Sequence, residues 1–251
     1  MPKWVFLVGC NNSGTTMLNH FLGLHPDIDP LRREGQDSPC MPSPSDYPDG
    51  HGFKLGRVWS EKAEIFRVPE VENVEQLKQS WLAMRVSKGG KYVMEKSPPN
   101  TVRSIWLQDN FPDSRFIGIV RNGYAVSEGI KRRKRESINY ERAARHWCKS
   151  NKIMLCDSKF LEYFRLVKYE NFVVNPSKEL YCLESFLEIP HFDYDTITKK
   201  PFSIKGEPHN PIQNMNGKSL EALTWKQRKI IRENACEILD FFEYKAQQNQ
   251  G

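Results

Sequence analysis

The chain has 251 residues, of which 39% are hydrophobic and 27% charged, a composition that excludes a disordered or fibrous protein and suits one α/β domain. Its 37 Lys and Arg against 31 Asp and Glu give a formal net charge of +6, which suits an anionic ligand without requiring one. No segment has the apolar length of a membrane span. The six cysteines form no Cys-x-x-Cys pair. Because the apolar run at the start is too short for a signal peptide, we expect a cytoplasmic protein with reduced thiols.

Short apolar strands alternate with helical patterns along the chain. In chain order, the sequence predicts a strand over Lys3–Gly9, a helix around Met17–Leu22, a helix over Val74–Val86, a strand over Tyr92–Met94, a helix over Asn100–Asn110, a strand over Arg115–Val120, and helices over Tyr124–Arg133 and Tyr140–Phe160; a strand over Phe164–Tyr169 and helices over Lys178–Leu187 and Trp225–Phe242 follow. This alternation predicts a parallel sheet covered by helices on both faces.

We expect a single α/β domain over residues 1–251. Two stretches are rich in turn-forming residues, one around 25–72 and one around 190–218, and we expect them to be mostly loop. The first is expected to lie on one side of the ligand-binding region. In parallel sheets ligands bind beyond the carboxyl ends of the strands, so the residues that follow each predicted strand are the candidates for chemistry.

A polar turn follows the first predicted strand and leads into the first helix. Its residues are Gly9, Cys10, Asn11, Asn12, Ser13, Gly14, Thr15 and Thr16. This layout is typical of a phosphate-binding loop, in which backbone N–H groups and hydroxyls surround an oxyanion at the helix N-terminus. The simpler interpretation is a tight turn in which Ser13 caps the helix.

The loop lacks the features of a nucleotide hydrolase or kinase. That class needs a Lys after the second Gly and an Asp at a strand end to hold magnesium. Here Thr15 follows Gly14, and the other strand ends carry Lys96 and Arg121. A site with cations and no metal-binding carboxylate predicts an anion bound without a metal. A P-loop kinase using ATP stays as the alternative.

Five motifs in order resemble PAPS-dependent sulfotransferases, most closely their carbohydrate and tyrosyl-protein branches. They are Ser13-Gly14-Thr15-Thr16, Leu24-His25-Pro26-Asp27-Ile28, Glu95-Lys96-Ser97-Pro98, Phe111-Pro112-Asp113-Ser114-Arg115 through Val120-Arg121-Asn122-Gly123, and Val167-Lys168-Tyr169-Glu170-Asn171 with Asn175-Pro176. The resemblance covers residues 4–189 and fades after Pro190. It implies a P-loop-type fold and PAPS (3′-phosphoadenosine 5′-phosphosulfate) as the sulfonate donor.

The resemblance also implies residue roles. Asn11–Thr16 would hold the 5′-phosphosulfate, Arg121 the 3′-phosphate, and Tyr169 would lie near the adenine. The family usually has a Ser at the position of Gly129; here either Ser127, two residues earlier, substitutes for it, or the phosphate depends on backbone and Arg121. Many members also have Lys or Arg where this chain has Asn12.

Two residues are candidates for catalysis. By resemblance Lys96 contacts the sulfonate or its bridging oxygen, where a fixed cation would stabilise the charge that develops on the leaving group. The simpler interpretation is a surface Lys paired with Glu95. Glu34 lies where several branches place a catalytic Glu, and could take the proton of the acceptor hydroxyl. It could equally be a solvated loop carboxylate, and His51 is the rival base.

These observations predict a sulfotransferase that moves a sulfonate from PAPS to a hydroxyl acceptor, without a metal. A carbohydrate or glycoconjugate is the first expectation for the acceptor, and a tyrosyl or small-alcohol acceptor stays open. The basic run Lys131–Arg135 is best explained as a solvated helix end, although it could attract an anionic acceptor. A nucleic-acid-binding module is the remaining alternative, but no aromatic platform accompanies the basic residues, so we expect no nucleic acid. The sequence leaves the oligomeric state open.

Overall fold

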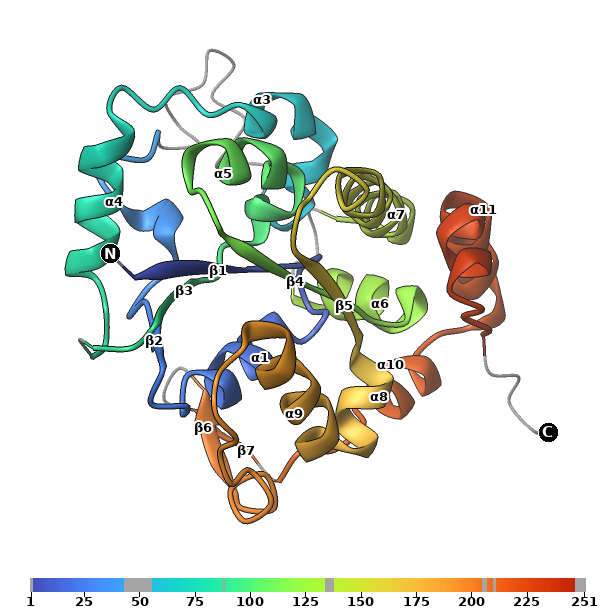
Figure 1. Ribbon diagram of the computed structural model, residues 1–251. Coiled ribbons are helices and arrows are strands. Elements are labelled where there is room, and N and C mark those ends of the chain that lie inside the picture. The colour runs from blue at the N-terminus through green and yellow to red at the C-terminus, as the bar shows by residue number, and fades with distance from the viewer. Residues whose placement is uncertain are drawn as a thin grey trace.

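A five-stranded parallel sheet with the order β2-β3-β1-β4-β5 forms the centre of the protein (Figure 1). Its strands are β1 (Lys3–Val8), β2 (Ile28–Pro30), β3 (Tyr92–Glu95), β4 (Arg115–Val120) and β5 (Phe164–Lys168). The chain builds outward from β1 in both directions, so the strand order reverses beside β1. Such a reversal is where open α/β sheets bind their ligands.

The computed structural model describes residues 2–42, 56–87, 89–133, 138–204, 207–209 and 211–246. His51, and the last two residues of the basic run 131–135, lie outside these residues. Among the helices of this part of the chain, none combines the length and the apolar character needed to cross a membrane.

Helices cover both faces of the sheet, which confirms the expected α/β class (Figure 1). One face packs against α4 (Val74–Ala83), α5 (Ser104–Asn110) and α7 (Tyr140–Asp157). On the same side, α3 (Ala63–Arg67) packs against Trp59 and Val102. The other face packs against α1 (Thr15–Leu22), α8 (Tyr169–Val174) and α9 (Pro176–Leu187). Beside β4 and β5 lie α6 (Gly123–Arg133), α10 (Asn216–Glu221) and α11 (Trp225–Phe241).

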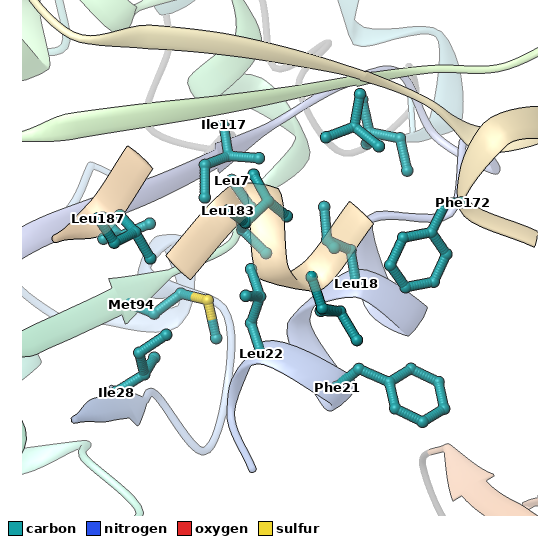
Figure 2. Close-up of a cluster of buried hydrophobic side chains, with 14 of the residues drawn as sticks. Leu7, Leu18, Phe21, Leu22, Ile28, Met94, Ile117, Phe172, Leu183 and Leu187 are labelled. Atoms are coloured by element: carbon teal, nitrogen blue, oxygen red, sulfur yellow. The ribbon is translucent and has the colours of Figure 1, made fainter. Parts of the chain in front are cut away.

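The central strand alternates its side chains between two buried clusters, as period-two geometry requires. Trp4, Phe6 and Val8 pack against Trp81 of α4 and against Phe111. Their neighbours in the strand point to the opposite face, where Leu7 joins the side chains of α1 and α9 (Figure 2). Figure 2 shows Leu18, Phe21 and Leu22 of α1 meeting Leu183 and Leu187 of α9, with Ile117 of β4 above them. The loop between β1 and α1 is therefore attached to two well-packed elements.

The structure differs from the sequence prediction where side chains compete with regular backbone bonds. The predicted helix over Asn100–Asn110 is split into a 3-10 turn η3 (Pro98–Val102) and α5. Asn100 receives a hydrogen bond from Arg103, and Thr101 donates to the carbonyl of Pro98. Such local side-chain bonds favour turns over continuous helix, so the chain turns at this point.

Both turn-rich stretches contain short elements that sequence patterns miss. The first contains β2, the 3-10 turns η1 (Gly35–Asp37) and η2 (Gly56–Lys62), and α3. The second contains a hairpin of β6 (Phe202–Ile204) and β7 (Glu207–His209) and the start of α10. Three-residue strands are too short to show a period, and Pro30 within β2 also argues against a strand unless it lies at an edge. Its edge position explains why this proline is tolerated.

A buried histidine joins α7 to η2 below the loop that follows β1. His146 is fully buried, and its Nδ1 lies 2.6 Å from the hydroxyl of Ser60. Its ring packs edge to face on Trp59, whose indole N–H donates to the side chain of Asn11. Burial lowers the pKa of His146 from 6.5 to about 3, because a charged imidazole loses its hydration there.

This shift predicts a specific acid sensitivity. Below pH 6.5 His146 becomes protonated in the unfolded chain, whereas in the folded chain it stays neutral until about pH 3. The free energy of unfolding is therefore highest above pH 6.5 and falls as the pH drops from 6.5 towards 3. Replacing His146 by Gln removes this titration. Between pH 6 and 4, the unfolding free energy of the native protein should fall more steeply than that of His146→Gln, by up to about 1.4 kcal/mol per pH unit. Urea unfolding at several pH values measures both slopes, and equal slopes would contradict the prediction.

Candidate active site

The loop between β1 and α1 contains two residues in the left-handed conformation. Asn12 has φ of 65° and Gly14 has φ of 102°, while the N–H of Ser13 closes the turn on the carbonyl of Cys10 at 3.1 Å. Left-handed residues within such a turn direct successive backbone N–H groups toward one side, where they can bind an anion. Helix α1 starts immediately afterwards, so its unpaired N-terminal N–H groups face the same end.

Two buried hydroxyls, one of them in this loop, lack hydrogen-bond partners within the described part of the chain. They are the Oγ atoms of Ser13 and of Ser127 on α6, both on fully buried residues. Gly14, not Ser13, is the N-cap of α1, and no side chain caps the helix. An unpaired buried polar group costs about 1–3 kcal/mol. A ligand that brings an acceptor oxygen to the Ser13 hydroxyl would remove that cost, so the loop fits a phosphate or sulfate group.

The loop is fixed to its neighbours at its start. The N–H of Gly9 donates to the Thr101 hydroxyl at 2.7 Å, and a Cβ at Gly9 would lie 2.6 Å from the carbonyl oxygen of Ile119 in β4. Asn11 accepts the indole N–H of Trp59 at 2.6 Å. The backbone of the loop therefore passes so close to β4 that only glycine fits at its first position.

The structure brings Arg121, Asn12 and Tyr169 together. The Arg121 guanidinium donates to the carbonyl of Asn12 at 3.0 Å and lies 4.3 Å from the centre of the Tyr169 ring. Its Nε donates to the side chain of Asn216 at 2.8 Å. Burial lowers the pKa of Arg121, although a guanidinium stays charged at any physiological pH. A half-buried cation thus lies directly against the loop.

The pairing of Asn12 with Gly129 accounts for two departures from the family pattern. A Cβ at Gly129 would lie 3.1 Å from Nδ2 of Asn12, so any larger residue on α6 at this position would press on the loop. The space that a serine would take at position 129 is filled from the loop side. Ser127, on the same helix, keeps a buried hydroxyl.

The two catalytic candidates form an ion pair. Nζ of Lys96, at the end of β3, lies 2.5 Å from Oε1 of Glu34, and the two side chains are 9% and 21% exposed. The side-chain amide of Gln36 donates to the other oxygen of Glu34 at 2.6 Å. The simpler interpretation of Lys96 as a partner of Glu95 is not what the structure shows, because Glu95 is fully buried and accepts other donors.

Sequence reasoning missed the C-terminal residues that complete this region. Glu170 accepts hydrogen bonds from the backbone N–H of Asn122 at 2.9 Å, the side chain of Asn216 at 2.7 Å and the hydroxyl of Tyr244 at 2.8 Å. The Tyr169 hydroxyl accepts from the N–H of Met215 at 3.1 Å. The position of Glu170 at the end of β5 was a usable signal, but nothing in the sequence marks Asn216 or Tyr244.

His25 and the basic run make contacts that serve the fold. His25 is buried, accepts the N–H of Asp27 through Nδ1 and donates from Nε2 to the carbonyl of Pro190. In the basic run, Arg132 pairs with Glu128 one helical turn earlier. Within the described residues, no group of three or more His, Cys, Asp or Glu side chains is placed to hold a metal ion.

The fold and the loop define an α/β protein with a phosphate-binding loop at the end of its central strand. The sequence model of the sulfotransferase family matches residues 2–194, and the chain belongs to this family. It is 26% identical over 206 residues to protein-tyrosine sulfotransferase 2 of Gallus gallus, which covers 75% of this chain and 52% of that protein. With protein-tyrosine sulfotransferase A of Caenorhabditis elegans it shares 22% identity over 233 residues, which covers 88% of this chain and 60% of that protein. The chain thus spans about half the length of the curated relatives it matches.

Solved structures show the same fold at lower identity. The sulfotransferase domain of the olefin synthase from Synechococcus PCC 7002 superimposes with a TM-score of 0.64 at 19% identity, covering 97% of this chain and 96% of that domain. A mouse sulfotransferase crystallised with PAP superimposes with a TM-score of 0.54 at 16% identity, covering 95% and 85% of the two chains. Because these superpositions cover nearly the whole chain, the shared fold extends beyond residue 194, where the family match ends.

The conformation of Gly14 predicts that alanine is not tolerated there. A Cβ would meet the Tyr169 ring at 2.9 Å, and φ of 102° is strained for any L-residue. Gly14→Ala should lower the unfolding free energy by about 1–3 kcal/mol. Gly217→Ala is the matched control, because φ of Gly217 is not positive and a methyl group added there would lie 4.0 Å from its nearest neighbouring atom. Chemical denaturation measures both, and equal effects would contradict the prediction.

Proposed function

We propose that this protein transfers a sulfonate group from PAPS to a hydroxyl group of an acceptor. The observation that carries the proposal is the loop between β1 and α1. In a member of the sulfotransferase family, this loop follows the central strand, has left-handed turn residues, and carries the buried Ser13 hydroxyl, which has no partner among the described residues. These features support an oxyanion ligand at this position.

The residues that would hold PAPS come from three strand ends. The backbone and side chains of Asn11–Thr16 would receive the 5′-phosphosulfate, with Ser13 as a buried donor. The 3′-phosphate would bind Arg121, whose guanidinium has five N–H donors. It would also bind Ser127, which would replace the serine that the family usually has at the position of Gly129. Tyr169 would lie beside the adenine. Helix α6, which carries Ser127 and Gly129, begins two residues after Arg121 and so can contribute to the same subsite.

Lys96 and Glu34 would serve the two sides of the transfer. When bound, PAPS supplies a sulfonate on a good leaving group. The ammonium of Lys96 would stabilise negative charge on the leaving side, and Glu34 would take the proton of the attacking hydroxyl. Among the described residues, each oxygen of Glu34 has one donor. A carboxylate oxygen has two lone pairs, so an acceptor hydroxyl can still approach.

A tyrosyl hydroxyl is the acceptor that the relatives favour, since those named above are protein-tyrosine sulfotransferases. A carbohydrate hydroxyl, the first expectation from the sequence, is the second candidate. Arg32 and Arg33, the two residues before Glu34, are exposed. Their positive charge supports an acceptor with negative charge near its hydroxyl. Transfer of labelled sulfonate to acidic tyrosyl peptides, to neutral tyrosyl peptides and to glycans tests this order directly.

The cofactor proposal predicts that adenosine 3′,5′-bisphosphate raises the melting temperature, because a ligand that binds only the folded state stabilises it. Arg121→Ala should weaken binding of the bisphosphate by about 1.5–3 kcal/mol, and binding of adenosine 5′-phosphosulfate much less. Asn216→Ala is the control, since it removes a partner of Arg121 and leaves the cation. A thermal shift with ATP and magnesium, and none with the bisphosphate, would favour the kinase instead.

The role of Glu34 predicts a separation of binding from turnover. Glu34→Gln keeps the shape and the bond from Gln36 but cannot take a proton, so turnover should fall about 100-fold or more while the bisphosphate binds as before. His51→Ala should have a mild effect. Rates of sulfonate transfer for both variants measure this, and the reverse pattern would assign the base to His51.

A further inference from the structure

A fully buried carboxylate lies next to the ion pair of Glu34 and Lys96. Glu95, the last residue of β3, has no exposed surface. Its Oε1 accepts the backbone N–H of Gly35 at 2.7 Å and the hydroxyl of Ser97, and its Oε2 accepts the side-chain amide of Asn100. Each of these three partners is a donor, which is the environment that an ionised carboxylate needs in the interior.

The surroundings of Glu95 shift its pKa in opposite directions. Burial raises the pKa of Glu95, while the hydroxyl of Ser97, the charge of Arg103 and the N–H of Gly35 act to lower it. Burying a carboxylate is costly unless it is fully hydrogen bonded. A chain that only needed to fill this space could use an apolar side chain, so the hydrogen bonds of Glu95 are the feature that requires explanation.

Those hydrogen bonds fix the backbone directly after Glu34. Gly35 lies between Glu95 and Trp81: a Cβ there would be 2.7 Å from Oε1 of Glu95 and 2.8 Å from the indole ring. The indole N–H of Trp81 donates to the carbonyl of Gly35 at 3.0 Å. The N–H of Gln36 donates to the Ser97 hydroxyl at 3.2 Å. The peptide groups on both sides of Gly35 are thus held by β3, by the residues after it, and by α4.

We propose that Glu95 is a positioning residue that sets the carboxylate of Glu34 against Lys96. Lys96 extends from the same strand end as Glu95, so one short segment supplies both the cation that pairs with Glu34 and the acceptor that holds the backbone of Glu34's neighbour. The distance of 2.5 Å between Glu34 and Lys96 then depends on the bond from Gly35 to Glu95. This inference rests on the proposed role of Glu34 as the base.

The test is a double-mutant cycle on turnover. Glu95→Gln keeps the volume, but its amide cannot accept from both Gly35 and Asn100. Misplacing a catalytic group by about 1 Å can cost about 100-fold, so kcat should fall about 10- to 100-fold while the bisphosphate binds unchanged. In a Glu34→Gln background the same substitution should lower kcat less than twofold, because no base remains to be misplaced. An equal drop in both backgrounds would overturn the proposal.

Two further variants separate positioning from general damage. Gly35→Ala adds a methyl group where the structure has no room and should reproduce the effect of Glu95→Gln, including its loss in the Glu34→Gln background. Glu184→Gln is the matched control. Glu184 is also fully buried and accepts the backbone N–H of Phe192 at 2.9 Å, but it lies on α9. The Glu184→Gln variant should reduce stability without changing kcat. A fall in kcat equal to that of Glu95→Gln would contradict the assignment.

A readout independent of activity distinguishes this inference from the proposed function. Hydrogen exchange of a peptide spanning residues 31–38 should speed up in Glu95→Gln at the N–H groups of Gly35 and Gln36, while exchange in β1 and β4 stays slow. If the native protein transfers no sulfonate, the proposed function fails and the exchange result still tests the geometry. Unchanged exchange at Gly35 would overturn the positioning role whether or not the protein is active.

Discussion

The candidate site depends on one close contact, in which the backbone just after β1 lies against the backbone of β4. Gly9 lies so near to Ile119 that a single methyl group could not be inserted. This contact places the following loop over the reversal in strand order, where the ends of β3 and β4 flank it. The same loop is then held from one side by Thr101 and from the other by Arg121. A parallel sheet whose central strand is buried on both faces supplies the rigidity that such a loop requires.

Sequence reasoning predicted the elements whose signal is local. The continuous apolar run of β1 and the polar turn after it identify a strand followed by an anion-binding loop, and the structure has both. The ends of β3, β4 and β5 were predicted correctly enough to select Lys96, Arg121 and Tyr169. Helices with strong periodicity, such as α7 and α11, were also predicted within a few residues.

What could not be predicted depends on contacts between distant segments. The pairing of Glu34 with Lys96 joins residues 62 positions apart, and no periodic pattern encodes such a contact. The sequence indicated no role for Glu95 beyond that of a possible ion partner of Lys96, since acidic residues are rarely fully buried. Its role emerges only when Gly35 and Trp81 are seen around it. The hairpin of β6 and β7 is too short for any pattern to reveal.

Glu95, at the end of β3, and Lys96, the next residue, have contrasting surroundings. Glu95 is enclosed and fully bonded, whereas Lys96 reaches a partly exposed partner. The alternation of side chains along an extended segment explains this difference, since neighbours point to opposite sides. One side chain can thus be inaccessible while the next one pairs with a partly exposed carboxylate.

The bonds of Glu170 have a consequence for where this protein can be divided. The family match ends at residue 194, yet Asn216 and Tyr244 supply two of the donors that compensate the Glu170 carboxylate, and Asn216 also binds the guanidinium beside it. A fragment cut at the boundary of the family match would leave an acidic and a basic group without these partners. The segment that the family model matches is therefore shorter than the set of elements that these bonds join.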